Sequence, residues 1–429
     1  MKVLWFCNTP SNAAAELGSN SKGGGWISSL ETLVTDQTDI ELGVAFFYPL
    51  QEDRTIVKGR TTYFAVALEE KGPIGRIKDR FFLNLPSDSK LFRLIQIIDK
   101  YKPDLIHVFG SEEVFGMVAK YVTTPVVLHI QGILTPYLDQ WFPKGVSNLA
   151  ILKKSPIKDS VRATGLYFDY RTISKMAKRE RQIFKYCKNY MGRTYWDESV
   201  SQLLSPGSTY YQCEEVLRPF FFSVEWEQPG KEVPFTISTT INPNIYKGLD
   251  IILKTAKLLK QQAGLEFQWN IYGINETHQL VRFFEGILKD SFKANGVVFK
   301  GPVDATQLVS ALRESHLFVH PSHIDNSPNS VCEAMLMGMP VIAANTGGVG
   351  SLLEHQKEGI LYPDNDQYLL ARHILELAKQ PEQAKQFGEQ ARIRAINRHN
   401  PATIIKRLEE IYSLIVQNSK VSTANFQLQ

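Results

Sequence analysis

Residues 320–348 read HPSHIDNSPNSVCEAMLMGMPVIAANTGG, and this pattern indicates the class of fold. The apolar runs at its two ends, 316–320 and 340–344, predict buried strands. Between them, Ser327 and Pro328 predict the start of a helix, with Ser327 as its N-cap and Pro328 at the first helical position. A strand, a loop, a helix and a second strand in this order are typical of a doubly wound α/β sheet.

The turn before this helix carries groups expected of a nucleotide site. The free backbone N–H groups of Asn329, Ser330 and Val331 face the carboxyl end of the strand, where phosphates bind. Glu333 lies one helical turn further along and is placed to accept hydrogen bonds from a ribose. Asp325 precedes the helix. A single acid near a helix start usually faces water, so the prediction depends on the cap, the acid spacing and the glycines that follow, taken together.

The spacing of Asp325 and Glu333 resembles the E-x7-E signature of the retaining glycosyltransferases of family 4, which are of the glycosyltransferase group 1 type. The resemblance implies a GT-B fold, in which two Rossmann-like domains face each other across a cleft. It also implies that Glu333 binds the ribose of a nucleotide sugar and that Asp325 lies beside the transferred sugar. The chain departs from the family pattern in two ways: the first acid is Asp rather than Glu, and residues 326–330 replace the common Gly-Phe-Gly.

The composition is that of an ordinary globular protein. The chain has 429 residues, 43% hydrophobic and 21% charged, a length that favours two domains over one. No apolar stretch approaches the roughly 18 residues of a membrane span, and the apolar run within 1–7 is shorter than that of a signal peptide. The four cysteines lack the spacing of a zinc site or a disulfide framework. We therefore expect a reducing, cytoplasmic location.

Hydrophobic periodicity divides the chain into two halves that each alternate strands and helices, separated by a polar, turn-rich segment at 220–234. We predict domains at 1–222 and 235–400, and the resemblance implies that the first binds the acceptor and the second the nucleotide-sugar donor. By resemblance, a final helix, 401–418, crosses back onto the first domain. The other predicted strands are 3–7, 42–48, 63–66, 105–109, 125–130, 189–193, 235–240, 268–272 and 297–299, and the other predicted helices are 26–35, 89–100, 112–121, 249–261, 276–289 and 305–315.

Three further segments carry residues expected at the cleft. Lys247, just ahead of a helix, is suited to neutralise a donor diphosphate, and the family has a similar Lys-Gly with a preceding Arg that this chain lacks. Gly24 and Gly25 belong to a three-glycine loop before a helix, which is suited to a phosphate or sugar oxygen. The resemblance also places Gln131, where the family often has His, beside the transferred sugar, and brings Arg193 to the donor across the cleft.

The net charge of +4 is too small to indicate nucleic acid binding, but basic residues gather at 144–188. They are interleaved with aromatic and aliphatic residues, a mixture typical of proteins that contact anionic membranes. The alternative is a solvated helix whose apolar stripe, at Ile173, Met176, Ile183 and Phe184, packs onto the core. Both interpretations are compatible with the sequence.

The resemblance implies an enzyme, a retaining hexosyltransferase that moves a sugar from a nucleotide-diphosphate sugar to a hydroxyl of a glycan or lipid-linked acceptor. Asp325 and Lys247 are the predicted catalytic residues. Because the leaving phosphate can take the proton of the acceptor, we expect no dedicated side-chain base, no metal and no other cofactor. Family habit favours polysaccharide or glycolipid biosynthesis, with peripheral contact at the inner face of the cell membrane.

Two other functions compete with this one. A nucleotide-sugar 2-epimerase shares the architecture but needs acid and base groups in the cleft, and the first half shows no clear carboxylate at a strand end. A catalytically silent sugar-binding subunit is compatible with Gln131 in place of His and with the missing Arg.

Overall fold

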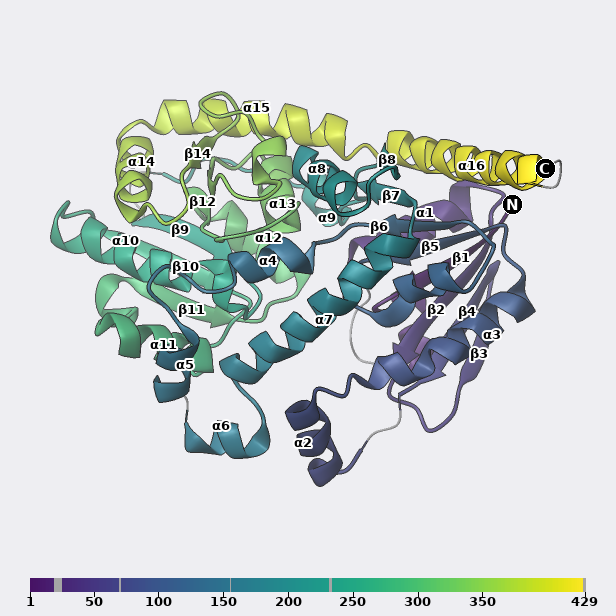
Figure 1. Ribbon diagram of the computed structural model, residues 1–429. Coiled ribbons are helices and arrows are strands. Elements are labelled where there is room, and N and C mark those ends of the chain that lie inside the picture. Colours follow the sequence, from purple (N-terminus) through teal and green to yellow (C-terminus); the bar gives the residue numbers. More distant parts are fainter. Residues whose placement is uncertain (19–24, 69–70, 155, 231–233, 427–429) are drawn as a thin grey trace.

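The computed structural model describes residues 1–18, 25–68, 71–154, 156–230 and 234–426. Two α/β domains lie side by side, and two helices at the C-terminal end run along one side of both (Figure 1). Each domain is built on a mainly parallel sheet, which confirms the predicted pair of doubly wound domains. Across the described ranges, no helix is both long enough and apolar enough to cross a bilayer.

The first sheet has eight strands in the order β3-β4-β2-β1-β5-β6-β7-β8, and only β3 and β4 pair antiparallel. Its strands are β1 (Lys2–Cys7), β2 (Glu41–Tyr48), β3 (Arg54–Lys58), β4 (Thr61–Ala67), β5 (Leu105–Phe109), β6 (Val126–His129), β7 (Asn189–Gly192) and β8 (Thr209–Gln212). Its helices are α1 (Trp26–Gln37), α2 (Pro73–Phe82), α3 (Leu91–Tyr101), α4 (Leu134–Asp139), α5 (Asn148–Lys154), α6 (Ile157–Arg162), α7 (Leu166–Tyr186) and α8 (Tyr195–Leu204). The strands predicted in this half are present, with ends that differ by at most two residues.

The second sheet has six parallel strands in the order β11-β10-β9-β12-β13-β14. They are β9 (Phe235–Thr240), β10 (Phe267–Tyr272), β11 (Val297–Gly301), β12 (Leu317–His320), β13 (Val341–Ala344) and β14 (Ile360–Tyr362). The helices of this domain are α10 (Leu249–Gln261), α11 (Gln279–Leu288), α12 (Ala305–Arg313), α13 (Asn329–Met337), α14 (Gln367–Lys379) and α15 (Pro381–Arg398). β9 and α10 have the predicted bounds, because each is a regular apolar pattern with clear end signals.

The predicted helix at 112–121 is wrong in type. The segment forms a 3-10 helix, η4 (Val114–Lys120), that packs against α7. A Cβ atom added to Gly116 would lie 2.5 Å from the Ile183 side chain, so this turn is pressed closely onto the helix. Glycine in the middle of the segment also weakens an α-helix.

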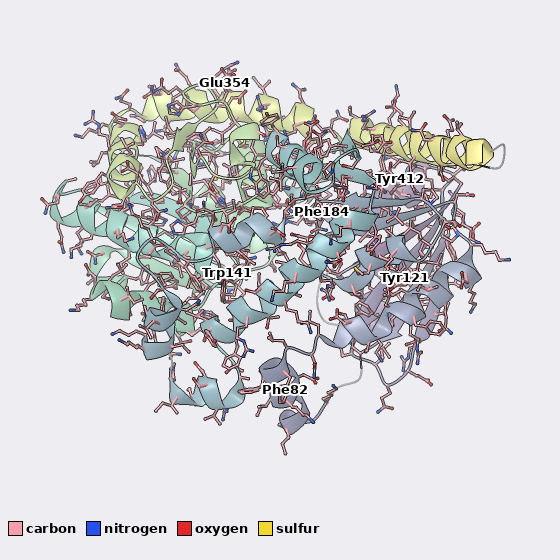
Figure 2. All side chains as sticks on the ribbon, viewed as in Figure 1. Phe82, Tyr121, Trp141, Phe184, Glu354 and Tyr412 are labelled. Carbon is pink, nitrogen blue, oxygen red and sulfur yellow. The ribbon has the colours of Figure 1, made fainter. Side chains whose placement is uncertain are left out.

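The C-terminal helix crosses back to the first domain, as predicted, and is longer than expected. It is α16 (Pro401–Phe426) and follows α15 after a short break (Figure 1). Its buried face joins the core of the first domain, where the Trp5 indole donates a hydrogen bond to the Tyr412 hydroxyl at 3.0 Å (Figure 2). The helix therefore ties the two domains together.

The segment between the sheets belongs largely to the second domain. It contains a short helix, α9 (Phe220–Ser223), whose Phe221 is buried in that domain's core together with Leu217 and Trp226. The Trp226 indole donates to the Ser315 carbonyl at 2.7 Å. The chain thus enters the second domain at about Leu217, shortly before the predicted boundary at 222 and well before β9.

Candidate active site

The loops after β6 and β7 of the first domain contact the loop after β12 of the second. The Thr194 hydroxyl donates to Oδ1 of Asn326 at 2.7 Å, and the Asn326 amide donates to Oδ2 of Asp197 at 2.8 Å. The same amide lies 3.4 Å from the Gln131 carbonyl oxygen. A Cβ atom on Gly348 would lie 2.4 Å from the Asn326 carbonyl, so a glycine is required for this close approach. The candidate site lies around this contact.

Asp325 is buried beside two nitrogen groups. Its Oδ2 lies 2.5 Å from Nζ of Lys247 and 3.2 Å from Nε2 of His320. Burial alone would raise the pKa of Asp325, but Lys247 and the nearby His320 hold it well below its usual range. Burial lowers the pKa of His320. Asp325 is therefore a carboxylate at neutral pH, so it can accept hydrogen bonds from sugar hydroxyls but cannot act as an acid.

Glu333 is paired with a residue that the sequence did not single out. Its two carboxylate oxygens each lie 2.8 Å from the Arg218 guanidinium, which approaches through Nε and Nη2. Burial raises the pKa of Glu333, and Arg218 opposes this effect. Two bonds occupy only part of the acceptor capacity of a carboxylate. The arginine therefore fixes the orientation of Glu333 and leaves lone pairs for further hydroxyl donors.

The start of α13 differs from the prediction. Pro328 occupies the N-cap position, and no side chain caps the helix. Instead, the Ser327 hydroxyl donates to Oε1 of Glu215 at 2.9 Å. Glu215 is completely buried, so its carboxylate needs donors, and this need outweighs the N-cap preference of serine. The predicted capping role of Ser327 is wrong.

The three predicted phosphate-binding amides are not equivalent. The Val331 N–H already donates to the Pro328 carbonyl at 2.9 Å, so it is engaged within the first turn. The amides of Asn329 and Ser330 have no acceptor within the described part of the chain, and both residues are partly exposed. Val331 is thus corrected to a structural residue, and Asn329 and Ser330 remain candidates at the helix N-terminus.

The glycine loop of the first domain is described only at its last residue. Gly25 is the N-cap of α1 and has a φ of 56°, a conformation that glycine adopts without strain. Gly24 lies outside the described residues.

His129 is the last residue of β6, and Gln131 lies in the loop that follows. His129 is buried, and its Nδ1 lies 3.1 Å from Nε2 of His107, so both histidines are core residues. Gln131 comes just after β6, next to Asn326. Its side-chain nitrogen is buried and has no hydrogen-bond partner in the described ranges. An unpaired amide next to the contact between the two domains is consistent with a group that binds a sugar oxygen.

Arg193 does not reach the open cleft. Its guanidinium is buried, lies 3.5 Å from Glu215 and stacks over Trp26 at 5.5 Å. It also donates to the carbonyl of Ile130 at 3.3 Å. The prediction that Arg193 meets the donor is therefore wrong: the arginine compensates the buried charge of Glu215, which would otherwise be costly.

The first domain does place a carboxyl group shortly after a strand end, contrary to the expectation of none. Glu112 follows β5 closely, and burial raises its pKa to about 7. No cation pairs with its side chain among the described residues. Burial raises the pKa of Tyr137, and Asp325 and Glu112 add to this effect; the same three causes raise the pKa of Tyr246. The two tyrosines, whose rings are 5.5 Å apart, are therefore close enough to both acids to feel their charges.

His323 supplies a buried cation close to the site. Its Nε2 lies 2.8 Å from Asp250 and its Nδ1 lies 2.7 Å from Asp364. Burial alone would lower the pKa of His323, but the two carboxylates raise it to about 9. Because both ring nitrogens are occupied, the imidazolium cannot replace the missing arginine on a donor phosphate.

One group of side chains has the composition of a metal site. Glu215, Cys332 and His399 offer ligand atoms that all lie within 4.8 Å of one another. However, Glu215 is already paired with Arg193, and burial raises the pKa of the Cys332 thiol well above its usual range. A protonated thiol beside a compensated carboxylate is a poor cation site. This group therefore does not fit a metal ion.

Comparison with known proteins agrees with this geometry. Residues 228–394 match the family of glycosyl transferases group 1. The matched region contains Lys247, Asp325 and Glu333. The match therefore lies within the second domain and the segment that leads into it, and Gln131 lies outside it.

Two curated relatives are similar over part of the chain. The amylovoran biosynthesis glycosyltransferase AmsK of Erwinia amylovora is 31% identical over 141 residues, 31% of this chain and 33% of AmsK. The putative colanic acid biosynthesis glycosyltransferase WcaL of Escherichia coli is 28% identical over 135 residues, 30% of this chain and 32% of WcaL. The chain thus aligns with about a third of the length of these relatives.

Solved structures resemble the whole molecule. The sucrose-phosphate synthase of Thermosynechococcus elongatus has a TM-score of 0.70 and 14% identity, with coverage of 97% of this chain and 100% of its own. Anabaena HepE, solved with UDP and glucose, has a TM-score of 0.63 and 15% identity, with coverage of 96% and 99%. With the two facing doubly wound domains, these likenesses identify the fold as GT-B.

Proposed function

We propose that the protein is a glycosyltransferase of polysaccharide biosynthesis, which transfers a sugar from a nucleotide-diphosphate sugar to an acceptor hydroxyl with retention of configuration. One observation carries the proposal: an ionised, buried Asp325 held by Lys247 shares a helix–loop unit with Glu333, inside the region that matches the family. The relatives AmsK and WcaL, which are described as glycosyltransferases of amylovoran and colanic acid biosynthesis, support the pathway. HepE, solved with UDP and with UDP-glucose, supports a nucleotide-diphosphate donor.

In the proposed complex, the donor lies along the loop after β12 and the start of α13. Glu333, oriented by Arg218, accepts hydrogen bonds from the ribose hydroxyls. The amides of Asn329 and Ser330 donate to the diphosphate at the positive end of the helix. Lys247 uses one of its three N–H groups for Asp325 and offers the others to the phosphate.

The proposed reaction breaks the bond between the anomeric carbon and the phosphate oxygen and forms a bond from the same carbon to the acceptor oxygen, on the same face. The acceptor proton moves to the leaving phosphate oxygen, so no side-chain base is required. Lys247 and the α13 amides stabilise the charge that develops on the diphosphate. Asp325 and Gln131 position the transferred sugar. We expect no metal in this chemistry.

We also propose that the protein contacts the inner face of the cell membrane, through a smaller surface than the basic segment 144–188. Within that segment, α7 is engaged elsewhere: Arg179 pairs with Asp88, and Lys175 donates to the Leu83 carbonyl. The apolar stripe of α7 packs onto the core, with its C-terminal end buried. The short helices α5 and α6 stay exposed and keep their basic side chains, Lys153, Lys154, Lys158 and Arg162.

An epimerase remains the weaker alternative. Glu112 would supply one of the proton-transfer groups that such a reaction needs, but the related proteins named above are described as glycosyltransferases. A silent sugar-binding subunit would bind nucleotide without releasing it from a donor.

The test is the release of nucleoside diphosphate from a panel of UDP-, GDP- and ADP-sugars, with the linkage configuration of any product read by NMR. We expect release from one donor class, slowed about 100-fold or more in Lys247→Met, because the variant loses a charge that stabilises the leaving group. Lys257→Met, which removes an exposed lysine of α10 paired with Asp290, is the matched control and should keep wild-type rates. Equal rates in the two variants, or an inverted product, would contradict the proposal.

A further inference from the structure

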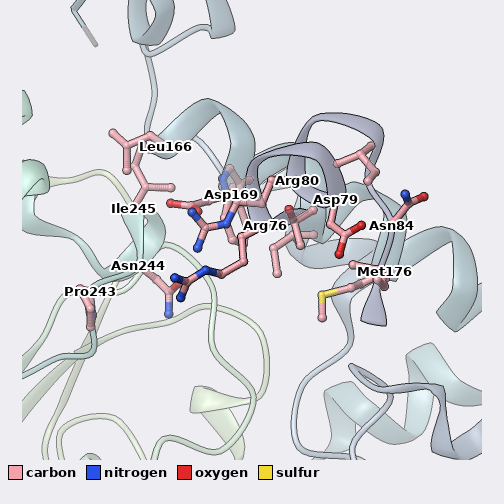
Figure 3. Close-up of a pocket in the computed structure, with 15 residues that line it drawn as sticks. Arg76, Asp79, Arg80, Asn84, Leu166, Asp169, Met176, Pro243, Asn244 and Ile245 are labelled. Carbon is pink, nitrogen blue, oxygen red and sulfur yellow. The ribbon is translucent and has the colours of Figure 1, made fainter. Parts of the chain in front are cut away.

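A cavity of about 580 Å³ opens between the two domains, next to the candidate site. Three segments form its walls: α2 with the turn after it, the first half of α7, and the loop 243–245 that follows β9 of the second domain (Figure 3). Trp141 closes one side. The proposed donor complex places no part of a ligand in this cavity.

The cavity lies beside the candidate active site. Ile245, one of its lining residues, lies two positions before Lys247 in the same 3-10 turn, η5 (Ile245–Lys247). Trp141, another lining residue, packs against the ring of Tyr246 with centroids 5.1 Å apart. A molecule in the cavity would therefore reach the neighbourhood of Asp325 from the side of the first domain.

The polar part of the cavity is cationic. Arg76 and Arg80 are one turn apart on α2, and their guanidinium groups extend into the cavity towards Asn244 and Asp169 (Figure 3). Neither arginine forms an ion pair within 4 Å in the described ranges, whereas Asp79, the other acid of the wall, is neutralised by Lys71 at 2.7 Å. Asp169 is a single opposing charge. Two guanidiniums with free N–H groups are suited to a phosphate.

The rest of the wall is mostly apolar, and its apolar part continues onto the protein surface. Leu83, Leu166, Ile173 and Met176 line the interior. Outside, α2 carries apolar side chains that a folded protein normally buries away from water. α6 carries further ones on the same side of the molecule (Figures 1 and 2). The exposed side chains are Ile74 (83%), Phe81 and Phe82 on α2, and Ile157 and Val161 on α6.

We propose that this cavity binds the acceptor, and that the acceptor is an anionic amphiphile: a phosphate or diphosphate linked to an apolar chain and carrying a short sugar. The phosphate binds between Arg76 and Arg80, and the chain leaves the cavity along the exposed faces of α2 and α6. The sugar hydroxyl then points past Tyr246 towards Asp325. This inference rests on the proposed glycosyl transfer and narrows its acceptor from any glycan or lipid-linked molecule to this one class.

The test is calorimetric titration of the full chain, saturated with UDP so that the donor site is occupied. Three probes separate the charged part of the ligand from its apolar chain. Farnesyl diphosphate has both parts, inorganic diphosphate has only the charged group, and farnesol has only the chain. We expect farnesyl diphosphate to bind at least about tenfold more tightly than either fragment. Equal binding of inorganic diphosphate would overturn the amphiphile, and equal binding of farnesol would overturn the role of the arginines.

The double variant Arg76→Glu/Arg80→Glu should weaken farnesyl diphosphate binding at least about tenfold and leave UDP binding unchanged. The matched control is Arg282→Glu/Lys300→Glu, which makes the same charge change on exposed residues of the second domain. Equal loss in both variants would reduce the effect to overall charge and overturn the site. If UDP does not bind the wild type, GDP or ADP takes its place as the saturating nucleotide. Failure of all three to bind would instead contradict the proposed donor function, which this titration therefore distinguishes from the acceptor cavity.

Discussion

The ion pair between Arg218 and Glu333 provides a sharp test of how the ribose-binding carboxylate is held. The change is Arg218→Met, which removes the guanidinium and keeps an apolar stem over the ring of Phe221. The side chain of Glu333 is 5% exposed and that of Arg218 is 32% exposed. Loss of one partner of a buried pair costs about 3–5 kcal/mol in unfolding free energy. Because Arg218 is partly solvated, we expect a cost of about 2 kcal/mol at pH 8.

This cost should depend on pH in a defined direction. Burial already raises the pKa of Glu333, and loss of Arg218 removes the interaction that opposes this rise. In the unfolded chain the carboxyl of Glu333 loses its proton at its ordinary pKa. Above that pH, folding of the variant requires this carboxyl either to take up a proton again or to be buried as an unpaired charge, and both reduce stability. The stability deficit of Arg218→Met should therefore be small near pH 5 and grow towards pH 8.

The assay is urea unfolding at pH 5 and pH 8, with Arg372→Met as the matched control. Arg372 pairs with Glu376 one turn along the exposed face of α14, and loss of such a surface pair costs at most about 0.5 kcal/mol. Nucleotide binding by Arg218→Met should also weaken, since Glu333 loses both charge and orientation. A deficit at pH 8 no larger than that of Arg372→Met, or one that does not change with pH, would refute this reasoning.

Three further predictions concern other buried groups. Glu112→Gln should raise the melting temperature at pH 8 and leave it unchanged near pH 4.5. Burial raises the pKa of the Glu112 carboxyl to about 7, so its ionisation above that pH destabilises the fold. Thermal melts at the two pH values check this prediction. Stability should fall as pH rises from 6.5 towards 9, since two carboxylates raise the pKa of His323 to about 9, and His323→Gln should flatten this slope in a pH series of melts. Gly348→Ala should lower the melting temperature by several degrees, because the methyl group would lie 2.4 Å from the Asn326 carbonyl, whereas Gly286→Ala, which meets nothing within 4 Å, should not.

The sequence predicted the fold well where local patterns are regular. The helix 249–261 has its predicted bounds because apolar residues recur at helical spacing between a glycine and a polar end. The strand 235–240 is equally clear. The segment 112–121 was misjudged because its apolar content satisfies a helix, whereas a glycine pressed against Ile183 favours the tighter 3-10 turn.

Within the candidate site, the sequence indicated residues that share one local motif and missed those that the fold brings together. Asp325 and Glu333 are eight positions apart on one turn and helix, so their spacing predicted them. Arg218 lies 115 positions from Glu333, and only the linker packing places it there. Ser327 and Arg193 were given the wrong roles because both serve Glu215, a buried acid whose demand for partners no local pattern reveals.

The most direct test of the donor site is a calorimetric titration of UDP, GDP, ADP and CMP into the wild type and into Glu333→Ala. We predict that one nucleoside diphosphate binds the wild type selectively and that its affinity falls about tenfold or more in the folded variant, because the ribose hydroxyls lose their charged acceptor. Binding of none of the four by the wild type, or unchanged affinity in Glu333→Ala, would contradict the proposal that this cleft holds a nucleotide sugar.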